Sequence, residues 1–499
     1  MNPAEKMPTG AEEPSKPDFD FTAKEVLETL RPDFPNAYIE YVGSATSDFQ
    51  ANPVMYDALG NMLPPLSDWE FELQKNLKGQ ASGIKTQQDA AKLPRFFDKP
   101  EEYIDRSAEL GENMFRFSLD FGRLCPEKGE FDEGMMAEYV KALTLVRARG
   151  QEPMLTIHHF TMPKFLVETN RNDDIVKGGW ENPDVSKHFR FYIENVTKFL
   201  GDEDKVRGVL NSAGFAPESQ DKFLAEGLVK YFISINEPFT TFLNGYTTGV
   251  FPPYKHGGLM IKEVLKRMVE AHDVSFDELK KLGAHVPSDR EPQIGATYNW
   301  QHFDGLFGDI THKVANEMTT NAFERDGAHS DFLGLQYYFR NVVTPFASKK
   351  DRHFGDHPGF GDIYPPGILE VLKKMNEKYP QKEIFITEMG FADNADKRRP
   401  YWMLETMRYV LEAKRQGVPV KGMLLWSLVN NFEWDLGMDT KFGLFDEAQL
   451  DKPLTPVKGG VNGWEAWKAA TKAITSPSQE SLQELQNVYE KTKMQFEAN

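Results

Sequence analysis

The segment Tyr231–Asn236 reads YFISIN and runs directly into Glu237 and Pro238. Its apolar residues are almost continuous, whereas a strand with one face in water alternates apolar and polar side chains. A short continuous run is typical of a parallel strand that is covered on both faces. A carboxylate placed directly after such a strand is unusual, because charge is costly next to a core. This segment therefore predicts both a fold class and a place for chemistry.

Seven further segments have the same character, at residues 37–45, 114–119, 153–159, 294–299, 331–338, 383–388 and 422–430. Amphipathic patterns with apolar residues every three or four positions lie between them, at residues 133–150, 185–200, 367–379, 401–417 and 464–474. The alternation predicts an α/β fold, a single (β/α)8 TIM barrel with long βα loop insertions. An open doubly wound sheet is the alternative. A glycine-rich phosphate loop after the first strand would favour it, and none occurs.

We expect the barrel to occupy residues 37–475, between an acidic N-terminal extension (1–36) and a polar helical C-terminal tail (476–499). Residues 211–221 look like an irregular insertion, and the charged stretch 393–399 is predicted to be an exposed loop at the barrel entrance. The first twenty residues lack the apolar run of a secretory signal, so we expect a cytoplasmic protein.

Composition excludes several classes of function. Of the 499 residues, 58 are Lys or Arg and 76 are Asp or Glu, which gives a net charge of −18. Such a surface disfavours nucleic-acid and membrane partners. The single cysteine, Cys125, rules out an intrachain disulfide and a Cys-based zinc site. Because no His-Glu-x-x-His or similar set occurs either, we expect neither a metal nor another cofactor.

Two predicted strands end in a carboxylate: the fourth leads into Glu237, and the seventh ends in Glu388. In a barrel of eight strands we expect these two ends to face each other across the mouth, where TIM-barrel chemistry takes place. A structural salt bridge would explain one such residue. Two of them favour glycoside hydrolysis, which needs one protonated and one ionised carboxyl group.

The signature of a known family appears around these residues. Asn236-Glu237-Pro238, Ile386-Thr387-Glu388, Trp426-Ser427-Leu428 and Asn431-Phe432-Glu433-Trp434 resemble segments of glycoside hydrolase family 1, the family of retaining β-glucosidases and β-galactosidases. Further resembling segments follow in the family's order, at residues 45–50, 115–118, 159, 178–180, 245–249, 331–338 and 442–444. The resemblance covers about residues 38–474 and implies a divergent member that hydrolyses β-glycosides without a cofactor.

The resemblance also implies roles for individual residues. Glu388 is expected to be the nucleophile and Glu237 the general acid/base, with Arg116 supporting the nucleophile. Arg116 and Tyr338 beside Glu388 should lower its pKa, whereas burial beside neutral Asn236 should raise the pKa of Glu237. The residues expected to bind the sugar are Gln50, His159, Asn236, Tyr338, Trp426, Glu433 and Trp434.

The substrate expected from this resemblance is a small or oligosaccharide β-glycoside. The carboxylate of Glu433 should repel a phosphorylated sugar, which leaves a glucose or galactose type of glycone, or fucose. Four residues depart from the usual family pattern: Phe121 and Phe160 replace Trp, and Gln336 and Met389 replace Asn. Because of these departures, the resemblance does not decide the glycone preference, the shape of the aglycone pocket or whether glycosyl transfer is favoured over hydrolysis.

Two other functions stay open at this point: a transglycosylase on the same scaffold, and a non-catalytic sugar-binding protein. Retention of both carboxylates argues against the second. The oligomeric state is not indicated by the sequence.

Overall fold

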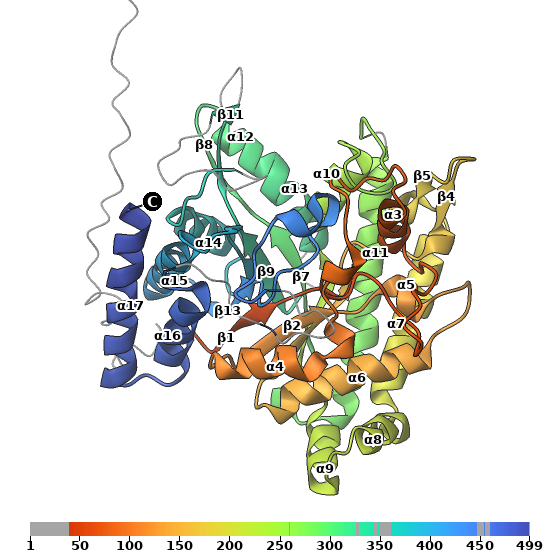
Figure 1. Ribbon diagram of the computed structural model, residues 1–499, viewed down its shortest axis with the longest axis horizontal. Coiled ribbons are helices and arrows are strands. Elements are labelled where there is room, and N and C mark those ends of the chain that lie inside the picture. The colour runs from red at the N-terminus through yellow and green to blue at the C-terminus, as the bar shows by residue number, and fades with distance from the viewer. Residues whose placement is uncertain are drawn as a thin grey trace, which may run out of the picture.

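A closed barrel of eight parallel strands forms the centre of the protein (Figure 1). The computed structural model describes residues 39–258, 260–325, 329–343, 348–349, 361–446, 454 and 460–498. The barrel strands are β1 (Tyr41–Ala45), β2 (Met114–Ser118), β3 (Glu152–His158), β6 (Tyr231–Asn236), β7 (Gln293–Asn299), β9 (Phe332–Tyr337), β12 (Glu383–Met389) and β13 (Val420–Trp426). They pair in chain order, and β13 closes the ring on β1. The TIM-barrel prediction is confirmed.

Each barrel strand is followed by a helix that covers the outside of the ring. The main covering helices are α4 (Pro100–Glu109), α6 (Glu133–Ala148), α7 (Val185–Gly201), α11 (Ile261–Lys280), α13 (Met318–Phe323), α14 (Gly367–Lys378), α15 (Arg399–Arg415) and α16 (Gly463–Thr475). Their apolar faces pack on the strands, as the three-to-four residue spacing predicts. The long loops carry α2 (Asp48–Ala51), α3 (Asp68–Leu77), α5 (Phe121–Leu124), α10 (Pro238–Tyr246) and α12 (Gly308–His312), and the small strands β4 (Val167–Thr169), β5 (Ile175–Gly178), β8 (His302–Asp304), β10 (Arg340–Val343) and β11 (Ser348–Lys349).

The lower part of the barrel interior is filled by side chains. Tyr41, Tyr231, Phe332 and Phe385 form a cluster in which the ring centroids of contacting pairs are 5.0–6.1 Å apart. The buried Arg116 and Glu388 lie toward the other end of the barrel, where the strands terminate.

Two regions differ from the sequence prediction. Residues 211–221 are not irregular: they contain the end of α8 (Glu203–Ser212) and the first half of α9 (Pro217–Glu226), a helical pair at the bottom of Figure 1. The strands that carry the two carboxylates are not directly opposite. On the shorter side of the ring, β7 and β9 separate β6 from β12.

The C-terminal tail contains α17 (Gln479–Glu497), which lies against α15 and α16 (Figure 1). The predicted extension 1–36 lies outside the described residues.

Candidate active site

Glu237 lies between the end of β6 and the start of α10. Its backbone φ of 41° is left-handed, a conformation that non-glycine residues rarely adopt. The N–H of Glu237 donates to the carbonyl oxygen of Thr297 at 3.1 Å, which holds this bend in place. The side chain is 5% exposed, and its hydrogen-bond partners, Thr240 and Asn299, are both neutral.

Glu388 lies near the end of β12 and is surrounded by donors. Its Oε1 accepts from Arg116 Nη1 at 2.6 Å and from Gln336 Nε2 at 2.6 Å. Its Oε2 accepts from the hydroxyl group of Tyr338. The Glu388 side chain is therefore held by a cation and two neutral donors, which favour the ionised form.

Arg116 connects the two carboxylate-bearing strand ends. Its guanidinium is fully buried, and its Nη2 donates to Asn236 Oδ1 at 2.7 Å while Nη1 contacts Glu388. Asn236 directly precedes Glu237. The predicted convergence of these residues in one site is thus present in the structure.

The two carboxyl groups influence each other's ionisation. Burial, and then the charge of Glu388, raise the pKa of Glu237 to about 8. Burial also raises the pKa of Glu388, although Arg116 and Tyr338 act in the opposite direction. The expected net lowering at Glu388 is therefore wrong, because burial outweighs the two favourable neighbours. Since two interacting carboxyl groups resist ionising together, the proton is favoured on Glu237, whose hydrogen-bond partners among the described residues include no cation.

His159 lies between two indole rings. Its ring centroid is 5.9 Å from that of Trp426 and 5.8 Å from that of Trp434, with interplanar angles of 22° and 16°. Its Nε2 is 3.3 Å from Asn236 Nδ2, and because an amide nitrogen only donates, Nε2 accepts there. Burial holds the pKa of His159 well below its usual value, so the ring is neutral. Trp434 itself is only 4% exposed and packs in an aromatic cluster with Phe49, Trp69, Phe160 and Phe251.

Gln50 and Glu433 form a second polar pair in the site. Gln50 Nε2 donates to Glu433 Oε2 at 3.0 Å, and the Gln50 Oε1 accepts from Ser47 Oγ at 2.9 Å. Asn431 and Trp426 are the further polar partners of the Glu433 side chain. Burial and the charge of Glu388 raise the pKa of Glu433 to about 8. All the site residues expected from the sequence are thus linked by direct contacts or by charge interaction.

Comparison with known proteins identifies the family. The sequence profile described as "Glycosyl hydrolase family 1" matches residues 32–220 and 310–451, well over half of the chain. The chain belongs to glycosyl hydrolase family 1. It is therefore an enzyme of the glycoside hydrolase class, built on the barrel fold of that family.

Named relatives are about a quarter identical to this family 1 chain over the aligned residues. A 1,4-beta-D-glucan glucohydrolase of Thermotoga neapolitana is 26% identical, over 70% of this chain and 84% of that protein. A Beta-galactosidase of Sulfolobus acidocaldarius is 24% identical, over 78% of this chain and 87% of that protein. The solved family 1 β-glucosidase of Thermotoga maritima superposes with a TM-score of 0.69 at 20% identity, over 89% of this chain and 99% of the other. This structural likeness supports the fold.

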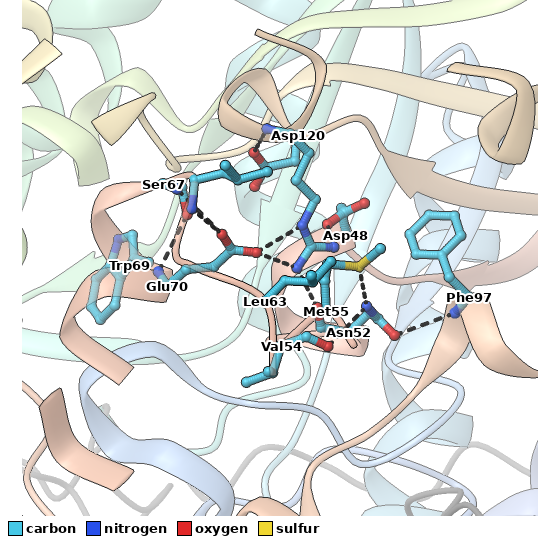
Figure 2. Close-up of polar contacts among 12 residues, drawn as sticks. Asp48, Asn52, Val54, Met55, Leu63, Ser67, Trp69, Glu70, Phe97 and Asp120 are labelled. Atoms are coloured by element: carbon cyan, nitrogen blue, oxygen red, sulfur yellow. Dashed lines mark hydrogen bonds and ion pairs between the residues drawn. The ribbon is translucent and has the colours of Figure 1, made fainter. Parts of the chain in front are cut away.

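Sequence reasoning missed a buried charged cluster under the loop that carries Gln50. In Figure 2, Asp48, Asn52 and Glu70 lie around one point. The hydrogen bonds and the ion pair of Arg123 with these residues place its guanidinium there. Arg123 Nη2 donates to Glu70 Oε1 and to the carbonyl oxygen of Asn52, both at 2.6 Å. Because Asp48 belongs to α2 with Gln50, this cluster fixes the helix that presents Gln50 to the site. Its members come from separate parts of the sequence, so no local sequence motif predicts the cluster.

Other kinds of site are not indicated in the described part of the chain. No group of three or more His, Cys, Asp or Glu side chains there is placed to hold a metal ion. None of its helices is both long and apolar enough to cross a membrane.

Proposed function

We propose that this family 1 chain is a retaining β-glycosidase of the β-glucosidase type. Glu388 attacks the anomeric carbon, the bond to the aglycone oxygen breaks, and Glu237 gives its proton to that oxygen. In the second step Glu237 takes a proton from water, and the water oxygen displaces Glu388 from the anomeric carbon. Sugar and aglycone are then both free, and each carboxyl group has its original charge.

One observation carries this assignment: the two carboxyl groups have opposite surroundings. A cation and two further donors contact Glu388, whereas the hydrogen-bond partners of Glu237 in the described part of the chain, Thr240 and Asn299, are neutral. A nucleophile has to be ionised and a general acid has to be protonated, so these surroundings suit different roles.

The remaining residues supply a sugar-binding surface. In this proposal the amide of Asn236 hydrogen-bonds the sugar 2-OH, a bond that strengthens as charge develops in the transition state. Gln50, His159 and Glu433 offer donors and acceptors for the other hydroxyl groups. Trp426 and Trp434 offer indole rings, which suit the apolar C–H face of a sugar.

A non-phosphorylated glucose or galactose type of glycone fits this site best. The polar partners of Glu433 among the described residues, Gln50, Asn431 and Trp426, are neutral. A sugar phosphate would therefore meet carboxyl groups without a compensating cation at that position. With a pKa of about 8, Glu433 is largely protonated at neutral pH and repels a phosphate group only weakly. The lack of a cationic partner for phosphate among the described contacts of Glu433 therefore matters more than charge repulsion. The names of the relatives, a glucan glucohydrolase and a Beta-galactosidase, support a β-linked glucose or galactose.

Trapping the covalent intermediate tests the proposal. A 2-deoxy-2-fluoro β-glucoside with a good leaving group forms the glycosyl ester but slows its breakdown. We expect mass spectrometry of the digested protein to find the added sugar on the peptide that contains Glu388. A working enzyme with the sugar on another residue, or with no adduct, would overturn the assignment of the nucleophile.

The same incubation separates hydrolysis from transfer. When an ordinary β-glucoside replaces the fluorosugar, free sugar should dominate the products at low acceptor concentration. Products in which an alcohol or a second sugar replaces water would instead identify a transglycosylase. Sugar binding without turnover of any aryl β-glycoside would identify a binding protein.

The pH dependence of kcat/KM should have a basic limb near pH 8. Glu237 has to enter the reaction protonated, and its raised pKa keeps the proton in place up to about that pH. Activity should therefore fall as pH rises through 8, and Glu237→Gln should abolish this limb on an activated substrate. Glu433 has a pKa in the same range, so Glu433→Gln is the necessary comparison. If the limb disappears only in Glu433→Gln, the acid role of Glu237 is wrong.

A further inference from the structure

Gln336 occupies a central position between the two strand ends that carry the carboxylates. It lies near the end of β9, in register with Glu388 of β12 on one side and with Asn299 of β7 on the other. Its side chain is fully buried. Thr297 of β7 is in turn in register with Asn236 of β6. The strands between β6 and β12 therefore bring the side-chain amide of Gln336 between the two strand ends that carry the carboxyl groups.

The amide nitrogen of Gln336 reaches acceptors on both sides of that gap. Nε2 lies 2.6 Å from Glu388 Oε1 and 2.8 Å from Asn236 Oδ1, and 3.3 Å from Thr297 Oγ1. A carboxylate oxygen and an amide oxygen both require a donor, so the atom between them is the nitrogen. The amide thus joins the carboxylate of Glu388 to the amide of Asn236 directly.

These contacts also fix how Asn236 is turned. Its Oδ1 receives three donors: Arg116 Nη2 at 2.7 Å, Thr297 Oγ1 at 2.9 Å and Gln336 Nε2. With Oδ1 occupied in this way, the donating Nδ2 is the part of the amide that remains for a sugar hydroxyl. The orientation of this donor therefore depends on Gln336 as well as on Arg116.

Stability alone does not explain a glutamine here. Its Oε1 is buried and has no hydrogen-bond partner among the described residues, which is costly for an enclosed carbonyl oxygen. An apolar side chain of the same length would avoid that cost. What the amide provides instead is its pair of bonds to Glu388 and Asn236.

We propose that Gln336 is a positioning residue that sets the Glu388 carboxylate and the 2-OH contact of Asn236 together. It touches neither the aglycone nor the proton of Glu237, and it acts through its two neighbours. The inference rests on the proposed function, because it needs Glu388 to attack and Asn236 to bind the 2-OH. It adds that attack by Glu388 and binding of the 2-OH by Asn236 both depend on the same side chain, Gln336.

A pair of substrates that differ only at the 2-position tests this dependence. In Gln336→Met the chain length is kept and the donor is lost. We expect kcat/KM to fall about 100-fold on 4-nitrophenyl β-glucoside, a typical loss for one donor aimed at a transition state. On the 2-deoxy analogue we expect kcat/KM to fall only about 10-fold. This substrate has no 2-OH for Asn236 to bind, so only the effect of Gln336 on Glu388 is lost. Gln336→Leu should show the same split and serves if the first variant unfolds.

Gln151→Met is the matched control. Gln151 is 1% exposed and also has an unpartnered Oε1, but it bonds Ser107 and Glu112 at the opposite end of the barrel. We expect this variant to alter thermal unfolding and to leave both kcat/KM values within about twofold of the wild type, since it lies far from the site. Equal falls on the two substrates in the Gln336 variants would overturn the inference while leaving the proposed function intact. Absence of a Glu388 adduct in the wild-type enzyme would overturn the proposed function, and the inference with it.

Discussion

Replacing Glu388 by glutamine is expected to reduce kcat on aryl β-glucosides by about 10⁴-fold or more, as removal of a covalent nucleophile does in other enzymes. Glutamine keeps the shape of the side chain and loses its negative charge. The amide cannot form the glycosyl ester, and Arg116 is left buried without its carboxylate partner. Steady-state kinetics on 4-nitrophenyl β-glucoside, with thermal unfolding measured alongside, provides the test.

A buried glutamate outside the site supplies the control for this variant. Glu405 of α15 is fully buried and pairs with Arg408, as Glu388 pairs with Arg116. We expect Glu405→Gln to lose stability and to keep its activity per folded molecule. A comparable loss of activity in both variants would mean that Glu388 acts through the fold and not through chemistry.

Rescue by azide tests the role of Glu388 without relying on the residual activity of the Glu388→Gln variant. In Glu388→Ala the missing carboxylate leaves space for a small anion on the face of the sugar opposite the aglycone. Attack from there by azide should give an α-glycosyl azide from an activated β-glucoside. A β-glycosyl azide would show that the carboxylate of Glu388 does not attack from that face.

Much of the fold could be predicted because each strand carries its own signal. YFISIN at β6 is buried on both faces, and its observed limits are those of the apolar run. The two carboxylates were found for a related reason: each follows or ends a buried strand, where an apolar residue would be expected from burial alone. Local patterns of this kind need no knowledge of the partner segments.

What the sequence could not show are features that depend on three-dimensional neighbours. The net direction of the Glu388 pKa follows from its burial, which no motif displays. The stretch 393–399 looked like an exposed charged loop, yet Asp396 and Arg399 are fully buried and pair at 2.7 Å. Opposite charges close in sequence are ambiguous, because a solvated loop and a buried ion pair contain the same residues.

Gln336 shows the same limit within the site. In the sequence it is only a departure from the usual asparagine of the family. Its importance emerges from register, since a bulge between Ile386 and Glu388 shifts the pairing that places Glu388 beside it. Alternation of residue types does not reveal such a shift.

Replacing Glu237 by glutamine is expected to separate substrates by leaving group. A poor leaving group, such as the second glucose of cellobiose, needs the proton that burial and Glu388 keep on Glu237. Its kcat/KM should fall by about 10³-fold, within the usual range for loss of a general acid. 2,4-Dinitrophenolate leaves without a proton, so kcat/KM for its β-glucoside should fall by less than about tenfold.

The second chemical step provides the confirming observation for Glu237. With the dinitrophenyl substrate the glycosyl ester still forms, but water attacks slowly because no base removes its proton. A burst of dinitrophenol should therefore precede a slow steady state. Azide needs no base and should speed that steady state while giving a β-glycosyl azide, the opposite anomer to that from Glu388→Ala. Equal losses on cellobiose and the dinitrophenyl substrate, without rescue by azide, would contradict the role of Glu237, because an acid/base residue acts only where a proton moves.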